Sequence, residues 1–225
     1  MKNTLIIFNA LIFSSAALAF GLPEIPGVSK SSGGSAASGP SASDSQEKIV
    51  TQFNTVLNHI LQAQYHVAEA LDLDEDVKEI KTQQARLSGD SCKGDCPKQV
   101  KESSDAVQKS INEKMAKSSE LDEDGKKELR KSYVPLAKGT YAMTKLGEAA
   151  KDWSKSAKDE IKSAGAMGAI KLKKKLSSGL YIVKTTPKII KNWASTSKSL
   201  IAFGKEQGIT DAQAIGSKKY SDEDE

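Results

Sequence analysis

Apolar residues recur every three or four positions along most of the chain beyond residue 44, which is the spacing that places them on one face of an α-helix. The most regular run consists of Ile49, Phe53, Val56, Ile60, Ala63, Val67 and Ala70. It predicts a helix over residues 45–71, and Asp44 with Glu47 three residues later is expected to form a capping box at its start.

The same periodicity predicts three further helical segments. They are expected at residues 75–88, at residues 98–117, and from a cap at Ser119 or Asp122 to about Ile161. Pro135 lies inside the last segment, so we expect a kink or a break between residues 132 and 136. Gly139 and Gly147 lie near the apolar stripe of that segment, which indicates either a close approach of another helix or simply a weaker helix.

The C-terminal third continues the helical spacing, with one ambiguous stretch. Residues 170–184 predict an amphipathic helix whose apolar stripe is Leu172, Leu176, Leu180 and Val183. The second half of this stretch also has the composition of a β-strand, but a lone strand would have no partner, so a helix is the better prediction. Thr186 and Pro187 are expected to be the cap and the first residue of a further helix, which carries Ile190 in its apolar stripe and ends near Gly208.

These segments together predict an all-α fold, a single helical bundle of five or six amphipathic helices over residues 44–215. Before it, residues 20–43 are rich in Gly, Ser, Pro and Ala and predict a flexible linker. After it, residues 216–225 end in Asp222-Glu-Asp-Glu and predict an acidic, frayed tail.

The first 19 residues have the order of an export signal. Lys2 gives a positive start, an apolar run follows from Leu5 to Leu18, and Ala17-Leu-Ala19 matches a small-x-small cleavage pattern. We therefore expect residues 1–19 to be removed after Ala19. The chain contains no Asn-x-Ser/Thr acceptor, which favours a bacterial source. The periplasm is the expected compartment, and release to the extracellular medium is the alternative.

The two cysteines fit an oxidising compartment. Cys92 and Cys96 are separated by three residues, including Gly94, and we expect a local disulfide between them. A thioredoxin-type site needs two intervening residues, and a zinc site needs two further ligands that no nearby spacing supplies. The pair is therefore interpreted as a structural disulfide.

Candidates for catalysis or metal binding are few. His59 and His66 are the only histidines, two helical turns apart, and are interpreted as exposed polar side chains. The acidic runs beginning at Asp72 and Glu120 fail as calcium loops and read as acidic helix starts. Since no nucleophile, phosphate-binding or dinucleotide motif is present, the chain is expected to be non-enzymatic and without a metal or cofactor. A hydrolase or metal protein using the two histidines is the alternative.

Charge is distributed unevenly along the chain. The totals are 33 basic and 29 acidic residues, a net charge of +4. Between Lys162 and Lys205, however, there are ten lysines and neither Asp nor Glu. Seven of these are the candidate residues for binding an anionic surface: Lys171, Lys173, Lys174, Lys175, Lys184, Lys188 and Lys191.

An apolar stripe with lysines is typical of an interfacial helix, but it is more often a bundle helix with a solvated basic face, because the following helix continues a core-like stripe. Tyr181 and Ile182 fall outside the predicted apolar arc, which adds slight support to a binding surface.

This distribution predicts an exported binding protein of the cell envelope, an adaptor or holdase, that uses its lysine-rich C-terminal third. Its expected partners are another envelope protein or an unfolded client, or an anionic lipid surface. Nucleic acid is not expected, because the chain is exported and its basic residues are not interleaved with arginine or aromatic residues. The alternative function is a secreted membrane-active protein, toxin-like or lipid-binding, in which residues 165–183 insert into a bilayer.

Overall fold

The computed structural model describes residues 41–88, 92, 94–118 and 120–221. The chain divides into two units, Met1–Ala37 and Ser38–Glu225, and every described residue belongs to the second. The predicted export signal of residues 1–19 and the predicted linker as far as residue 40 therefore lie outside the described residues.

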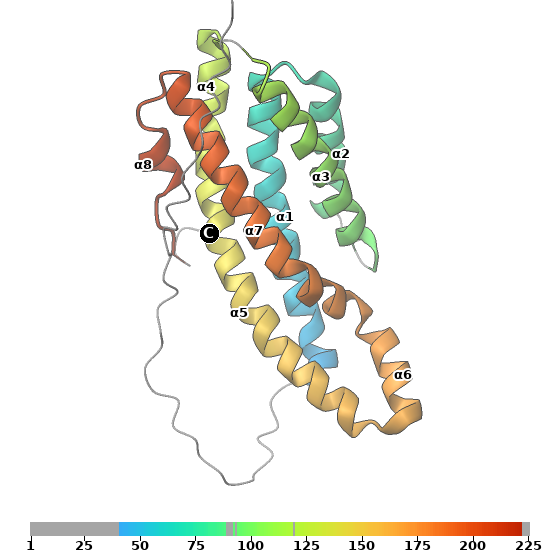
Figure 1. Ribbon diagram of the computed structural model, residues 1–225. Coiled ribbons are helices and arrows are strands. Elements are labelled where there is room, and N and C mark those ends of the chain that lie inside the picture. Colours follow the sequence, from blue (N-terminus) through green and yellow to red (C-terminus); the bar gives the residue numbers. More distant parts are fainter. Residues whose placement is uncertain (1–40, 89–91, 93, 119, 222–225) are drawn as a thin grey trace, which may run out of the picture. The chain divides into compact units, whose positions relative to one another are not determined.

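Over its described residues the chain is all-α, as predicted, and contains no strand (Figure 1). The helices are α1 (Ala42–Ala70), α2 (Asp74–Ser88), α3 (Cys96–Met115), α4 (Glu123–Lys131), α5 (Tyr133–Ser163), α6 (Gly165–Lys175), α7 (Ser177–Glu206) and α8 (Ala212–Gly216). Even without the five-residue α8, these described helices outnumber the five or six expected.

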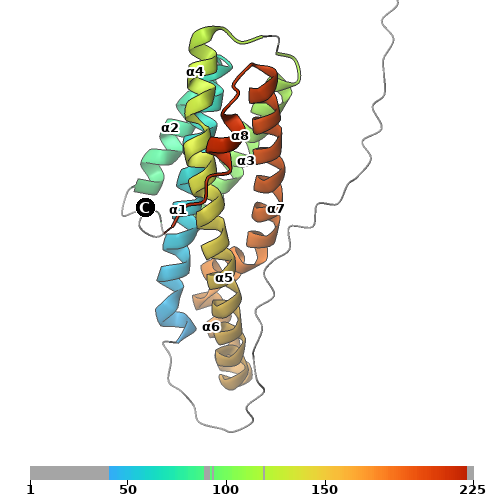
Figure 2. The same cartoon turned by 90° about the vertical axis from the view of Figure 1, so that its left-hand side faces the viewer.

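Helix α1 lies at the centre of the unit and contacts α2, α3, α4, α5 and α7. All seven members of its predicted apolar stripe are buried. Its largest contact is with α5, which runs antiparallel to it (Figures 1 and 2). At its start, the backbone of Ala42 is held by α5, since its carbonyl accepts from Trp153 Nε1 at 2.9 Å and its N–H donates to Glu160 Oε2 at 2.8 Å.

The start of α1 differs from the prediction by one helical turn. Ser41, rather than Asp44, is the N-cap, and its hydroxyl accepts from the Asp44 N–H at 3.2 Å and donates to Asp44 Oδ2 at 2.7 Å. Ser41 thus caps the helix through its hydroxyl, in place of the capping box predicted for Asp44 and Glu47. Ala42 is buried at this point, which is why the helix extends into the range assigned to the linker.

The break between α4 and α5 falls where Pro135 predicted it. The two helices are interrupted at Ser132, whose hydroxyl donates to the Leu129 carbonyl at 2.6 Å. Pro135 then lies in the first turn of α5, where its missing N–H leaves no helical bond unmade. As predicted, Asp122 caps α4 by accepting from the Gly125 N–H at 2.7 Å.

Glycines allow close contact between helices around α5. A Cβ built on Gly139 would lie 2.9 Å from Cζ2 of Trp193 on α7 and 3.3 Å from Cβ of His59 on α1. The predicted close approach at this glycine is therefore confirmed. At Gly147 the corresponding distance to Ile190 Cδ1 is 3.4 Å, which is ordinary packing.

Two aromatic side chains of α5 lie directly over glycines of α7. The ring of Trp153 occupies the space that a Cβ on Gly179 would need, and the hydroxyl of Tyr133 occupies that space at Gly204. The same hydroxyl donates to the Leu200 carbonyl at 3.3 Å. Together with Trp193 over Gly139, these contacts fix α7 in an antiparallel register against α5.

The predicted helix boundaries in the C-terminal third are wrong in two places. The expected helix over residues 170–184 is broken at Leu176, and the expected start at Pro187 lies inside α7. A proline inside a helix costs about 3 kcal/mol, but Ile182 and Trp193, on either side of Pro187, are both buried in the core. Because the residues on both sides of Pro187 are held in the core, one continuous helix is more stable here than two separate helices.

Local hydrogen bonds support the helix around this proline. Thr186, predicted to be a cap, instead donates its hydroxyl to the Ile182 carbonyl at 2.7 Å, and Thr185 donates to the Tyr181 carbonyl at 2.8 Å. Continuity through the proline also sets the phase of α7. Ile189 is consequently buried, whereas Ile190, expected in the apolar stripe, is 37% exposed.

Candidate binding surfaces

The seven predicted lysines form what we call the basic surface: Lys171, Lys173, Lys174 and Lys175 on α6, and Lys184, Lys188 and Lys191 on α7. All seven side chains are exposed. The three lysines of α7 follow one another at spacings of four and three, so they form a single stripe. None of the seven makes an ion pair with another described residue.

Helix α6 is unusual because it buries no residue. Leu172 is partly buried against the core and Leu176, at its end, is fully buried, so the predicted apolar stripe faces inward. The opposite side of α6 carries Met167 and Ile170, which are 75% and 68% exposed. The outward face is therefore partly apolar, which the predicted stripe of Leu172, Leu176, Leu180 and Val183 did not indicate.

The sequence interpretation of Tyr181 and Ile182 as surface residues is wrong. Ile182 is 1% exposed and belongs to the core. Tyr181 is partly buried and packs edge-on against Phe53, with 6.3 Å between ring centroids. Burial, followed by the negative charges of Glu102 and Asp105, raises the pKa of Tyr181 above its usual value. These residues anchor α7 rather than extend the basic surface.

The junction between α6 and α7 is held by a side chain from α1. Gln46 Oε1 accepts from the Gly179 N–H at 3.1 Å, and its Nε2 donates to the Lys175 carbonyl at 3.3 Å. One amide thus caps the start of α7 and the end of α6, where backbone groups lack helical partners. Sequence periodicity could not identify this role, because Gln46 lies more than 120 residues from the junction.

The disulfide also lies near the start of α7. Cys92 and Cys96 are bonded, as predicted, with their Cα atoms 5.1 Å apart. Gly94 between them has a φ of +62°, a conformation that favours glycine. Its carbonyl accepts from the Ser178 hydroxyl at 3.5 Å, and a small cavity of about 190 Å³ separates this turn from Tyr181. The disulfide therefore shapes a turn that borders the first turns of α7.

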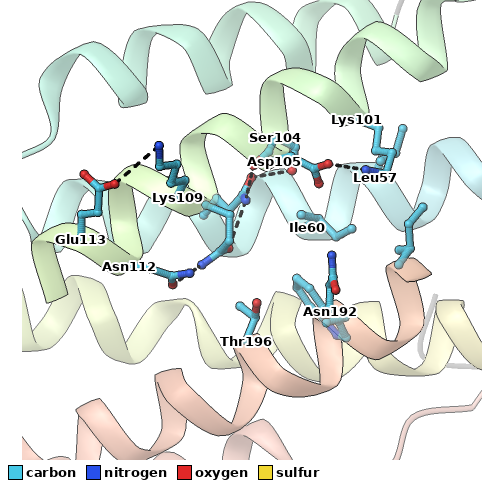
Figure 3. A pocket seen from close by; sticks show the side chains of 14 residues that line it. Leu57, Ile60, Lys101, Ser104, Asp105, Lys109, Asn112, Glu113, Asn192 and Thr196 are labelled. Carbon is cyan, nitrogen blue, oxygen red and sulfur yellow. Dashed lines mark hydrogen bonds and ion pairs between the residues drawn. The ribbon is translucent and has the colours of Figure 1, made fainter. Parts of the chain in front are cut away.

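A second concave site lies between α1, α3 and α7, with a volume of about 380 Å³ (Figure 3). Its apolar lining is Leu57 and Ile60 of α1 with Ile189 and Trp193 of α7. All four of these side chains are at most 9% exposed, so they offer a ligand little apolar surface.

The polar wall of this groove is largely satisfied by its own members. Gln64 is 2% exposed; its Nε2 donates to the Ser104 carbonyl at 2.9 Å and its Oε1 accepts from the Ser104 hydroxyl at 2.9 Å. Along the rim, Lys101 pairs with Asp105, and Lys109 lies 3.8 Å from Glu113 (Figure 3). The rim is consequently close to neutral, unlike the basic surface.

The two histidines are not the exposed side chains that the sequence predicted. Both are half-buried. His66 Nδ1 lies 3.2 Å from Glu128 Oε2. The neighbouring ammonium of Lys131, and His66 to a smaller extent, hold the pKa of Glu128 below its usual value. No group of three or more His, Cys, Asp or Glu in the described parts of the chain is arranged to hold a metal ion.

The acidic runs are helix starts, as predicted. Asp74 and Asp76 lie in the first turn of α2, and Glu123 and Asp124 in that of α4, where carboxylates interact favourably with the helix dipole. None of the helices in the described ranges is long and apolar enough to cross a membrane.

Comparisons of the chain with known protein families, with curated proteins and with solved structures found no match.

Proposed function

We propose that this chain is a non-enzymatic binding protein of the cell envelope that recognises an anionic partner through its basic surface. The observation that carries the proposal is the set of seven exposed lysines without an ion pair among the described residues. Such a set produces a local positive potential that attracts an acidic surface. Its partner is an acidic envelope protein, an unfolded acidic client or an anionic lipid surface.

The export pattern of residues 1–19 and the disulfide support the envelope as the place of action. An adaptor or a holdase needs a stable frame and a contact surface, and no catalytic group. The packing of α1, α5 and α7 provides such a frame. The basic surface lies on α6 and α7. Gln46 and the disulfide turn form hydrogen bonds with the first turn of α7.

A second candidate is a secreted membrane-active protein in which residues 165–183 leave the core and insert into a bilayer. The absence of any buried residue in α6 favours it. Release of the whole segment would, however, expose Leu176 and Ile182, which are 0% and 1% exposed. Exposing each of them costs about 1.5–3 kcal/mol. We therefore prefer a function in which the segment stays folded.

The test compares two variants that each lose four exposed positive charges. The first, K171Q/K174Q/K184Q/K188Q, removes charge from the basic surface, and the control, K81Q/K98Q/K109Q/K114Q, removes it from α2 and α3. Binding to poly-L-glutamate, which represents an acidic protein surface, and to phosphatidylglycerol vesicles is titrated at low and high salt. The net charge of the two variants is equal, so a difference between them reports the location of the charge.

We expect the first variant to lose at least a hundredfold in affinity for one or both probes, and the control to lose less than fivefold. Binding by the unmodified protein should weaken with salt, because exposed charges are screened. Equal losses in the two variants, or no binding to either probe, would contradict the proposal.

A further inference from the structure

The outward face of α6 combines apolar exposure with positive charge. Met167 and Ile170 are its most exposed large apolar side chains, at 75% and 68%. Elsewhere in the described residues, the most exposed large apolar side chains are Val134 and Ile190, at 43% and 37%. The strongest apolar exposure therefore lies within the only described stretch that has many lysines and no acidic residue.

Helical spacing places apolar and basic residues together on this face. Lys171 follows Met167 by four residues, and Lys174 follows Ile170 by four, so each pair lies one turn apart on the same side. Leu172, on the opposite side, packs against the core. α6 thus turns its apolar stripe toward the core, where it is partly buried, and has a second, smaller apolar patch outward between lysines.

The position of α6 leaves this face accessible. Figures 1 and 2 place α6 at the end of the unit opposite α4, beside the end of α5. The turn that joins it to α5 passes through Gly165, whose φ is +66°. Among the described helices, α6 packs appreciably only on α5 and α7, so no other described helix lies against its outer side.

The chemistry of this face fits an anionic phospholipid surface. Lysine side chains extend their apolar stems along a membrane interface while their ammonium groups reach phosphates, and apolar side chains between them enter the headgroup region. An acidic protein would match the lysines, but it would leave the exposed Met167 and Ile170 without a specific purpose. Charge complementarity and apolar exposure together point to lipid.

We propose that α6, while folded on the core, docks its outward face on an anionic bilayer, with Met167 and Ile170 entering the headgroup region and Lys171 and Lys174 contacting phosphates. This inference rests on the proposed function and specifies its partner. It differs from insertion of residues 165–183, because Leu172 stays packed against the core and Leu176 stays within it.

The test separates apolar insertion from charge. M167S/I170S removes the outward apolar patch and keeps every lysine, whereas V134S/I190S removes the exposed apolar residues of α5 and α7 as a matched control. Co-sedimentation with phosphatidylglycerol and with phosphatidylcholine vesicles measures affinity, and circular dichroism checks that the helices remain. A single M167W substitution adds an indole to the outward face, and V134W adds one on α5.

We expect the unmodified protein to bind phosphatidylglycerol and not phosphatidylcholine vesicles. M167S/I170S should lose at least tenfold in affinity, V134S/I190S less than threefold, and only M167W should show a blue shift with anionic vesicles. Wild-type affinity in M167S/I170S, or no blue shift in M167W, would overturn the docking.

Binding to poly-L-glutamate separates this failure from failure of the proposed function. If the protein binds poly-L-glutamate through the basic surface and binds no vesicles, docking on lipid is wrong, while the proposed anionic partner stands as a protein. If the four-lysine variant binds both probes as tightly as the unmodified protein, both proposals fail.

Discussion

Two regions of the molecule have the same number of positive charges but differ in their negative charges. One is the pair of helices α2 and α3, the α2–α3 hairpin, and the other is the segment from α6 to the middle of α7. The helices α2 and α3 together have seven basic residues, and residues 165–191 also have seven. The hairpin helices also have seven acidic residues, whereas residues 165–191 have none. Charge near α2 and α3 is therefore balanced locally, and charge near α6 is not.

Balance in the hairpin is visible as ion pairs within single helices. Lys78 lies 3.1 Å from Glu75, and Lys98 lies 4.0 Å from Glu102. Exposed pairs of this kind contribute only about 0–1 kcal/mol. Their absence from α6 therefore costs the fold little, but it leaves a positive potential at the surface. A run of like charges is therefore informative about binding when neighbouring helices do not neutralise it.

The two regions also differ in how they pack, and this gives the largest expected effect. Ile80 on α2 is 0% exposed, whereas Ile170 on α6 is 68% exposed. We expect I80A to lower the free energy of unfolding by about 2–5 kcal/mol, because it leaves a cavity in the core. The same deletion in I170A should change it by less than about 0.5 kcal/mol. Urea denaturation measures both, and equal losses would show that α6 is buried.

A second prediction concerns the frame that holds the basic surface. We expect G179A to lower the free energy of unfolding by about 1–3 kcal/mol, because its Cβ would overlap the Trp153 ring. G147A is the control, since its Cβ has room; it should be neutral or stabilise by up to about 1 kcal/mol through better helix propensity. Thermal unfolding followed by circular dichroism measures both. A neutral G179A would mean that α7 is not held in this register.

The smallest expected effect is a pH dependence of the free energy of unfolding that comes from Glu79, between α2 and α3. A hydrogen bond from Ser103, followed by one from Gln83, holds the pKa of Glu79 below its usual value of 4.5. Because the folded state favours the carboxylate, this group stabilises the fold above about pH 4.5, and the stabilisation is lost as the pH falls through the folded-state pKa. Glu79 is exposed, so the effect is below about 1 kcal/mol.

Urea titrations between about pH 6 and pH 3 measure this effect. In E79Q, and in S103A, which removes the main donor, the loss of stability on acidification should be smaller than in the unmodified protein. An unchanged pH profile in both variants would show that Glu79 is not stabilised across the hairpin. The basic surface has no carboxylate, so the variant K171Q/K174Q/K184Q/K188Q should keep the original profile.

Local patterns predicted those features that depend on neighbouring residues. The stripe of α1, the cap at Asp122, the break before Pro135 and the Cys92–Cys96 bond follow from spacings of a few residues. Predictions failed where distant contacts decide. Pro187 lies inside α7 because buried residues on both sides stabilise continuity, and Ile182 is buried because the core continues past the predicted lysine-rich helix.

The sequence by itself determined that the protein is helical, that its cysteines pair and that residues 162–205 contain many lysines and no acidic residue. These properties follow from periodicity, short loop closure and composition. Only the tertiary structure decided that Met167 and Ile170 stay exposed on the outer side of α6 and that Gln46 joins α6 to α7. A helix can turn either face to a core, and that choice depends on which neighbour can bury more apolar surface, a property of residues far apart in the chain.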